Sequence, residues 1–537
     1  MAGIALAASL SVLVWTTARH VAAAASGTWD ETIYLFLGRE LALSSNRAQL
    51  SDLGVAPLPV AIGWNRRTIE PVAAPPHDVA AYRGRIDRAR SRAVIWFAIP
   101  LVVGLFVIIA ASRGLAVGFV AAAIAAMSPN LAAHYSLATT DAAFVAVFLA
   151  CVAALIVYVR RQTAAGAVLM AIALGVALST KYSASILYLS AALLFALHRR
   201  SRRLGTDLVM FAASLAIAWG AHGFATAPLV VPGGTATHAI ESLLGWSGGG
   251  EAIARAVTEW RAPIFVRGIA AQLYLDRAGQ EAFLFGQTAQ HGWWYYFPVA
   301  VALKSTPVEL LGFAAFVILA VLRRFRDTES VVIVAVVSCY AGASLLSHRD
   351  LGIRYVLPVI VTAMAAVVVW MADALRGRPR MAAVAGAAAL AAQFVSYRSI
   401  GPDYLAYFND MSGGPAAGYT KLVDSNLDWG QDLMRLHDSL GSRGTDRVAL
   451  AYYGSAPPAA YGIAHEPVRS IAAAGSPDWL AVSATLLQGV FLCGDPFAPL
   501  RALSFDGRAG YSIFLFDLRR DDVRAAMAEI SKDPCLP

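Results

Sequence analysis

The chain has 537 residues, of which 58% are hydrophobic and 15% are charged, and its mean hydropathy is +0.58. This composition excludes an ordinary soluble globular protein and predicts a multi-span membrane protein. The net charge of +8 comes largely from arginines dispersed over short segments, which argues against a nucleic-acid partner because such a partner needs a continuous basic surface.

Apolar segments recur up to residue 399 and predict about eleven transmembrane helices, although several are shorter than the ~20 residues that a spanning helix needs. They lie at 1–18, 93–112, 114–127, 139–159, 164–180, 182–198, 206–224, 306–322, 330–346, 353–372 and 381–397. The first segment could instead be a signal peptide that ends in the small residues 22–26. No basic residue precedes it, which favours an uncleaved span.

Arginines predict the orientation of these helices, because they cluster in alternate short loops and the positive-inside rule places such loops in the cytoplasm. They are Arg113, Arg160, Arg161, Arg199, Arg200, Arg202, Arg203, Arg323, Arg324, Arg326, Arg376, Arg378 and Arg380. This alternation of arginine-rich loops places the loops 19–92 and 225–305, and the chain from residue 400, outside. We therefore expect a multi-pass protein of the cytoplasmic (inner) membrane with these regions on its extracytoplasmic side.

The three outward regions differ in composition and in the structure that we expect of them. The loop 19–92 is polar and ends in a basic stretch, whereas the loop 225–305 suits amphipathic helices on the membrane surface with an aromatic belt at 293–296. The chain from residue 400 predicts a small α/β domain. Its strand-like runs are 448–453, 479–483 and 511–516, and its helix-like runs are 429–440 and 520–531. We thus divide the chain into a membrane domain, 1–399, and an outward domain, 400–537.

The chain has four cysteines, and two of them, Cys493 and Cys535, lie in the outward domain. An oxidising compartment permits a disulfide there. Cys151 and Cys339 fall inside predicted spans, where they are most simply packing residues.

An acidic pair, Asp30 and Glu31, follows the first apolar segment. Ionisable groups at a membrane boundary are costly to desolvate, so this pair suggests chemistry at the bilayer surface. The alternative is a solvated pair in which Asp30 caps a helix.

Further polar residues gather at the predicted outward ends of the spans, among them two of the only four lysines, Lys181 and Lys304. Since the positive-inside rule disfavours outward basic charge, a lipid-carrier phosphate is a natural partner for them. The alternatives are snorkelling to lipid headgroups and pairing with Asp350.

Taken in order, these motifs resemble bacterial members of the protein O-mannosyltransferase-like glycosyltransferases (glycosyltransferase family 39), which have the GT-C fold. The motifs are Trp29-Asp30-Glu31, Ala133 to Asp141, Lys181-Tyr182, His291 to Pro298 with Lys304, and Leu351 to Pro358. The strings Tyr407 to Asp410 and Asp424 to Asp432 are similar to a motif of a bacterial subgroup. The resemblance covers essentially the whole chain; its order is specific, while each motif alone is weak.

The resemblance implies an all-α polytopic membrane domain of GT-C type with a small C-terminal α/β extracytoplasmic domain. It implies a transferase that moves a sugar, such as mannose or another hexose, from a polyprenyl-phosphate carrier to a glycan, lipid or protein acceptor. No cofactor is required, and a divalent metal is compatible with this chemistry but not demanded by any His/Asp cluster.

The resemblance also implies roles for individual residues. Asp30 is the expected catalytic base, with Glu31 as its neighbour or substitute and Asp141 as a second acid. The expected donor-binding residues are Lys181, Lys304, Arg354, Arg349, His291 and Tyr295. The expected acceptor-binding residues are His134, Asp424, Asn426, Asp428 and Trp429.

The string 424–432 has two interpretations, acceptor contact or a loop that seals the outward domain onto the membrane domain. Asp428 and Gln431 also fit a capping box for the helix that follows. A transporter is disfavoured because the spans are nearly free of charge, whereas a lipid-linked glycan polymerase or flippase is the nearest rival. A non-enzymatic membrane scaffold hardly needs so many spans.

Overall fold

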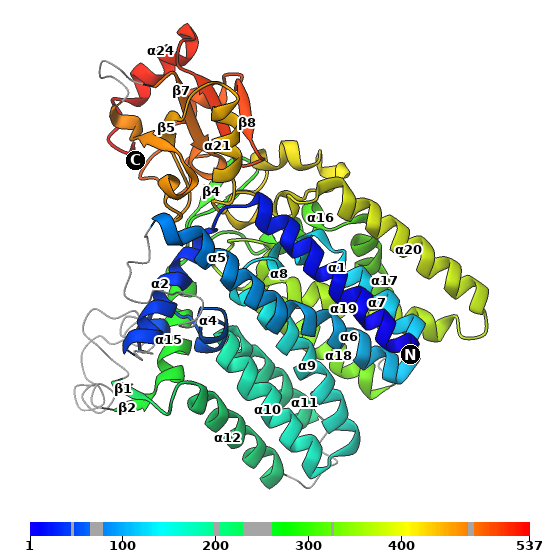
Figure 1. Ribbon diagram of the computed structural model, residues 1–537. Helices are drawn as coiled ribbons and strands as arrows, with labels where there is room; N and C mark the ends of the chain where they lie inside the picture. The colour runs from blue at the N-terminus through cyan, green and yellow to red at the C-terminus, as the bar shows by residue number, and fades with distance from the viewer. Residues whose placement is uncertain are drawn as a thin grey trace.

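The computed structural model describes residues 1–44, 48–64, 79–197, 204–228, 260–323, 327–470 and 477–536. Every apolar segment expected to cross the membrane is helical. The helices are α1 (Ala2–Ala24), α6 (Ile99–Arg113), α7 (Leu115–Ala126), α9 (Thr140–Arg161), α10 (Ala164–Thr180), α11 (Ser185–Leu197), α12 (Leu204–Ala221), α17 (Pro307–Arg323), α18 (Thr328–Leu345), α19 (Leu357–Ala374) and α20 (Pro379–Ile400). Figure 1 shows them packed into one bundle.

Within the described residues, six helices are long and apolar enough to cross a membrane, or up to seven if the bent pair α7 and α8 (Pro129–Tyr135) is one span. The predicted number was about eleven. The difference lies partly in α10, α11 and α17, which are apolar but shorter than the ~20 residues of a typical spanning helix. The architecture is that of a multi-pass membrane protein.

Local capping explains where several of these helices begin. The side chain of Thr163 accepts a hydrogen bond from Gly166 N at the start of α10, and Asp327 accepts one from Ser330 N at the start of α18. These bonds satisfy backbone N–H groups that have no partner within the helix.

A network of ion pairs marks one end of the bundle. Arg113 contacts Glu329 at 3.2 Å and Asp373 at 3.1 Å, and Arg160 contacts Glu329 at 3.4 Å. These contacts bring the C-terminal ends of α6, α9 and α19 together with the start of α18. Arg113 and Arg160, which were predicted to lie on one side of the membrane, thus lie at the same end of the bundle. The cluster 199–203, Arg324 and Arg326 lie outside the described residues.

The predicted first outward loop is largely helical. It contains α2 (Trp29–Ser44), α3 (Ala48–Asp52), α4 (Pro57–Gly63) and α5 (Val79–Ala93), and α5 continues through the π-helical turn η1 (Val94–Ala98) into α6. The basic stretch at the end of this loop is therefore the start of a long helix, because no helix-breaking residue separates it from the apolar segment. The expected N-cap at Asp30 is wrong, since Asp30 lies in the first turn of α2.

The second outward loop contributes two pairs of antiparallel strands and two helices within its described residues. Strands β1 (Thr226–Pro228) and β2 (Arg261–Pro263) pair, as do β3 (Ala282–Leu284) and β4 (Gln287–Ala289). The helices are α15 (Ile264–Ala278) and α16 (Tyr296–Lys304). In the predicted aromatic belt at 293–296, Trp294 and Tyr295 are 70% and 38% exposed, whereas Tyr296 is 1% exposed and packs inside the protein, so the prediction is wrong for Tyr296.

After α20, short 3₁₀ turns between Tyr404 and Asn426 cover the end of the bundle before the α/β domain begins at α21 (Leu433–Gly441). The five-stranded sheet has the order β6-β5-β7-β9-β8, with β5 parallel to β6 and β7, and β9 antiparallel to β7 and β8. The strands are β5 (Arg447–Ala451), β6 (Ala464–Glu466), β7 (Trp479–Ser483), β8 (Gly507–Ala509) and β9 (Ile513–Asp517). All three predicted strands are present.

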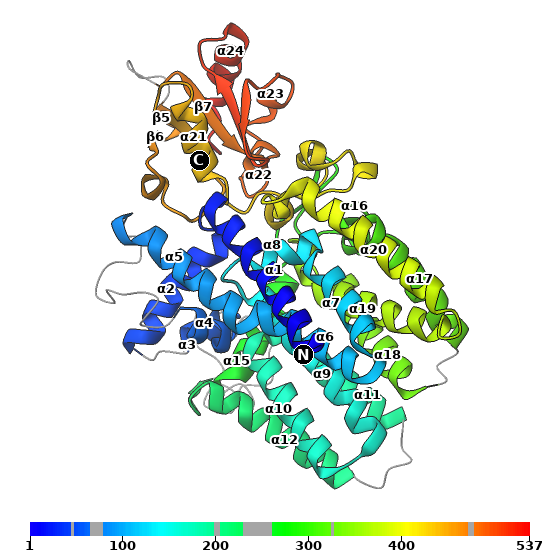
Figure 2. The same cartoon turned by 45° about the vertical axis from the view of Figure 1, so that its right-hand side comes forward.

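The three central strands β5, β7 and β9 are buried on both faces, which explains their nearly continuous apolar sequences, whereas the edge strand β6 is largely exposed. Along β9, Ile513 and Leu515 pack in the same cluster as the apolar side of α21, while Phe514 and Phe516 pack in the same cluster as α24 (Asp521–Ile530). Figure 2 shows this domain seated on one end of the helical bundle.

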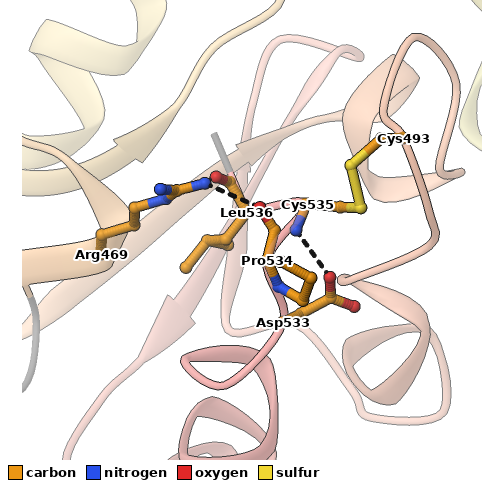
Figure 3. Close-up of a disulfide and its surroundings, with 6 residues drawn as sticks. All are labelled: Arg469, Cys493, Asp533, Pro534, Cys535 and Leu536. Carbon is orange, nitrogen blue, oxygen red and sulfur yellow. Dashed lines mark hydrogen bonds between the residues drawn. A yellow bond between two sulfur atoms is a disulfide. The ribbon is translucent and has the colours of Figure 1, made fainter.

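The predicted disulfide is present: Cys493 and Cys535 are bonded and close a segment with a separation of 42 residues. The C-terminal segment that carries Cys535 is also held by Arg469, which donates to the carbonyls of Pro534 and Leu536 (Figure 3). Cys151 and Cys339 are free thiols.

We therefore expect thiol labelling of the denatured, unreduced protein to modify only Cys151 and Cys339, measured by mass spectrometry. Reduction before labelling should add Cys493 and Cys535, and loss of the cross-link should cost about 3–4 kcal/mol in the chain-entropy model. Labelling of all four cysteines without reduction would contradict the pairing.

Candidate active site

Four predicted site residues from distant parts of the sequence meet at one end of the bundle: Asp30, Asp141, Lys181 and Arg354, which we call the four-charge cluster. Arg354 Nη1 donates to Asp30 Oδ2 at 2.8 Å and lies 3.7 Å from Asp141 Oδ2. Lys181 Nζ donates to Asp141 Oδ1 at 2.8 Å. Two carboxylates and two cations thus form one continuous chain of contacts.

Each member of the four-charge cluster is placed by the end of a helix. Asp30 lies in the first turn of α2 and Asp141 in the first turn of α9, whereas Lys181 directly follows α10. Arg354 lies in η3 (Ile353–Tyr355), just before α19. Since α9 also ends at the arginine network, the cluster and that network are separated by the length of α9, about 33 Å at 1.5 Å per residue.

Exposure divides the cluster into outer and inner members. The side chains of Asp30 and Lys181 are each 19% exposed, that of Arg354 is 9% exposed, and that of Asp141 is fully buried. Asp30 and Lys181 are thus partly open to solvent, whereas Asp141 is enclosed and contacts both cations.

Electrostatics keep both cations charged. Burial lowers the pKa of Lys181 and of Arg354, but the neighbouring carboxylates outweigh it and raise both pKa values, Asp141 acting on Lys181 and Asp30 foremost on Arg354. The Arg354 guanidinium also lies 4.3 Å from the ring centre of Trp429 and 5.1 Å from that of Tyr355. Cation–π contacts of this kind fix its position.

Glu31 is not part of the four-charge cluster, although it adjoins Asp30 in sequence. It is buried and paired with Arg90 at 2.8 Å, and it accepts hydrogen bonds from Thr28 N at 3.0 Å and Ala138 N at 2.9 Å. Burial alone would raise the pKa of Glu31, but Arg90 and these bonds hold it below its usual range. The string Thr28 to Glu31 is a capping-box pattern, which separates a structural Glu31 from Asp30.

The tail motif holds the turn that carries Arg354. Ser425 Oγ donates to Leu351 O at 2.6 Å, and Asn426 Oδ1 accepts from Ile353 N at 3.0 Å. Asn426 Nδ2 also donates to the Tyr296 hydroxyl at 2.8 Å. Asn426 is fully buried, so its side chain seals the outer loops onto the bundle.

The expected capping box at Asp428 and Gln431 is wrong, because α21 begins only at Leu433. Asp428 Oδ2 instead accepts from Thr485 N at 2.8 Å, and burial raises the pKa of Asp428 to about 8. Gln431 Oε1 accepts from Trp429 N at 2.8 Å. These contacts support the sealing interpretation for Asp428.

Asp424 and His134 lie beside the cluster. Asp424 lies near the Tyr453 side chain and contributes to the electrostatic environment of Arg354, and burial raises the pKa of Asp424 to about 6 against the opposing effect of Arg354. His134 Nδ1 is 3.7 Å from Asp141 Oδ2, and the His134 ring meets Trp429 edge-on. Of the predicted acceptor residues, Asp424, His134 and Trp429 thus adjoin the four-charge cluster.

Lys304 has other partners than the expected phosphate. It is 1% exposed, and its ammonium donates to the carbonyls of Leu405, Tyr407 and Asn426 at 2.5–3.0 Å. Three carbonyls satisfy the three donors of a lysine, so Lys304 fastens the turns after α20 to the bundle.

The remaining predicted donor residues also have other partners. His291 packs against His348 with ring centres 5.4 Å apart, Arg349 donates to Gln280 at 3.3 Å, and Tyr295 packs against Trp294. The structure does not bring these side chains into the four-charge cluster.

Sequence analysis did not assign a site role to Trp29 or to Tyr453. Their rings stack with centres 5.0 Å apart, Tyr453 stacks in turn on Phe491 at 5.4 Å, and Ser455 Oγ donates to Trp29 O at 2.8 Å. Tyr453 lies two residues beyond the end of the parallel strand β5. The carboxyl ends of parallel strands are where open α/β sheets bind ligands, and this signal was present in the predicted run 448–453.

In the part of the chain that the structure describes, no group of three or more His, Cys, Asp or Glu side chains could hold a metal ion.

Comparisons with known proteins add little. No protein-family model matches the sequence, and no curated protein matches it. Among solved structures, the chain is similar to the crystal structure of ArnT from Cupriavidus metallidurans in the apo state, at 12% identity, over 95% of this chain and 97% of that chain. The TM-score is 0.33, so no argument is built on this likeness.

The placement of Glu31 generates a test of stability. We expect Glu31→Ala to destabilise the protein by about 3–5 kcal/mol, because it leaves the buried Arg90 charge unpaired, and to lower its melting temperature in detergent. The matched change Asp30→Ala should cost less, because Asp141 stays 3.7 Å from Arg354 Nη1 and still balances the Arg354 charge. Equal melting temperatures for the two variants would contradict the structural role of Glu31.

Proposed function

We propose that this protein is a membrane glycosyltransferase of GT-C type that transfers a sugar from a polyprenyl-phosphate carrier to an acceptor hydroxyl. The observation that carries this proposal is the four-charge cluster, which combines a partly exposed carboxylate with two cations at one end of an apolar bundle. The resemblance of the ordered motifs to glycosyltransferase family 39 supports the same class. The acceptor is a glycan, a lipid or a protein.

The proposed reaction is a displacement at the anomeric carbon of the sugar. The acceptor oxygen forms a bond to that carbon, the bond from the carbon to the carrier phosphate oxygen breaks, and its electron pair stays on the phosphate. The acceptor proton passes to Asp30. The phosphate gains one negative charge as Asp30 loses one, so the total charge of the site stays constant.

Each member of the cluster has a defined part in this scheme. Arg354 and Lys181 contact the carrier phosphate and stabilise the charge that develops on it. Asp30 accepts the proton, because it is the carboxylate with exposed surface. Asp141 is a positioning residue that holds both cations, and Asp424 with Tyr453 offers polar groups to the acceptor.

A flippase or a polymerase of lipid-linked glycans would bind the same phosphate. A flippase needs no proton acceptor, so the dependence of turnover on Asp30 separates it from a transferase.

We expect Asp30→Asn to lower the transfer rate by roughly 10²–10⁴, as loss of a general base does, while carrier binding persists. Arg354→Ala should weaken carrier binding at least as much as turnover, because a phosphate contact exists in both ground and transition states. The measurement is release of free polyprenyl phosphate from a panel of polyprenyl-phosphate sugars by purified protein. Near-normal transfer by Asp30→Asn with a competent donor would refute the assignment of the base.

The proposed orientation puts the α/β domain and the cluster on the extracytoplasmic side. An alkaline phosphatase fused after Pro537 should therefore be active, whereas one fused after Arg203 should be inactive, because this enzyme folds only in an oxidising compartment. The reverse pattern of activities would overturn both the orientation and the location of the reaction.

A further inference from the structure

Arg354 has fewer partners than donors. Its Nη1 donates to Asp30, but its Nε is buried and has no hydrogen-bond partner among the described residues. A buried, unpaired donor typically costs about 1–3 kcal/mol, and here it belongs to a side chain that is only 9% exposed. Trp429 and Tyr355 pack against the guanidinium. The side chain is 9% exposed and its Nη1 meets the partly exposed Asp30, so an anion can approach Arg354 on the side that Asp30 now occupies.

Asp30 is the partner that can leave. Arg354 is the one hydrogen-bond partner that the structure gives the Asp30 carboxylate, and the side chain is 19% exposed at the start of α2. Asp141, in contrast, is fully buried and bonded to Lys181 at 2.8 Å. Moving Asp30 breaks one contact, whereas moving Asp141 would unpair Lys181 as well.

Charge balance requires such a move. Asp30 and Asp141 neutralise Arg354 and Lys181, so a phosphate that enters the cluster adds an uncompensated negative charge next to two carboxylates. Like charges in a poorly solvated site repel strongly. The repulsion is relieved when the phosphate takes the place of the carboxylate that leaves most easily, which is Asp30.

We propose that Asp30 and the phosphate monoester or diester of the lipid carrier compete for Arg354, so that donor binding releases Asp30 to act as the base. This inference rests on the proposed function and adds an order of events to it. While Asp30 is held by Arg354, its Oδ2 is engaged by a cation. Once the phosphate replaces it, the freed carboxylate stands beside the sugar and can take the acceptor proton.

Binding of decyl phosphate to full-length protein in a phosphate-free maltoside detergent tests the competition by isothermal titration calorimetry. We expect Asp30→Asn to bind decyl phosphate about ten-fold more tightly than the parent, since a charged competitor for Arg354 is removed. Arg354→Ala should lose binding. Glu329→Gln, which removes a carboxylate from the arginine network at the other end of α9, is the matched control and should bind like the parent.

A second measurement uses the unmodified protein and does not depend on the folding of a variant. Carbodiimide labelling of carboxylates, read by mass spectrometry, should modify Asp30 more when decyl phosphate is bound, whereas simple coverage by the ligand would lower the labelling. Inorganic phosphate serves as a comparison arm. Much weaker binding of inorganic phosphate supports a lipid phosphate as the ligand. Equal binding of the two would indicate a site for free anions and would contradict the proposal of a lipid carrier.

The outcomes separate the inference from the function on which it rests. If decyl phosphate binds the parent and needs Arg354, but Asp30→Asn does not tighten binding and Asp30 labelling falls, the competition is wrong while the phosphate site stands. If decyl phosphate binds neither the parent nor Asp30→Asn, the proposed function fails and the inference fails with it.

Discussion

A guanidinium that is nine-tenths buried at the end of an apolar helix bundle sets the main constraint on this structure. An isolated buried charge costs several kcal/mol, so Arg354 requires carboxylates from other elements. Asp30 comes from α2 and Asp141 from α9, which ties the start of the first outward loop and a central span to the turn before α19. The same pairing that stabilises Arg354 also brings two carboxylates and two cations together in one place.

The first loop and the tail motif are joined by backbone hydrogen bonds as well as by side chains. Ser26 N donates to Gln431 O at 2.8 Å, Trp29 N donates to Trp429 O at 2.9 Å, and Leu433 N donates to Ser26 Oγ at 3.1 Å. Trp29 thus enters α2 directly from this junction, one residue before Asp30. The segment that leads into the α/β domain is therefore part of the wall of the candidate site, because Ser26 and Trp29, just before Asp30, are bonded to residues 429–433.

The membrane helices could be predicted from sequence because long apolar runs have few alternatives to helix in a bilayer. The strands 448–453, 479–483 and 511–516 were predictable for a similar reason, as short apolar runs between turn residues. The roles of Glu31 and Lys304 could not be predicted from sequence. A charged residue looks the same in sequence whether its side chain is open to solvent or is buried against partners, which are Arg90 for Glu31 and three carbonyls for Lys304. Only the tertiary contacts separate these cases.

Two signals were in the sequence and pointed to what was missed. The Thr28 to Glu31 spacing of a capping box would have set Glu31 apart from Asp30, and Tyr453 stands at the carboxyl end of a predicted strand. The apparent capping box at Asp428 and Gln431 was a wrong prediction. The two residues have the right spacing in sequence, but their buried side chains bond to other groups and do not cap a helix. A capping pattern thus needs the helix start itself as evidence.

The two halves of the proposed reaction are supplied by different parts of the chain. The cations Lys181 and Arg354 belong to the ends of bundle helices, whereas Asp424 and Tyr453 belong to the chain after α20. Phosphate recognition requires only fixed charge, but recognition of an acceptor requires a shaped polar surface. Asp424 acts electrostatically on Arg354, so the proposed scheme couples acceptor recognition to the cation that holds the proposed base. Under that scheme, changes in the α/β domain should alter the acceptor without altering the chemistry, provided that Trp429 and its contact with Arg354 are kept.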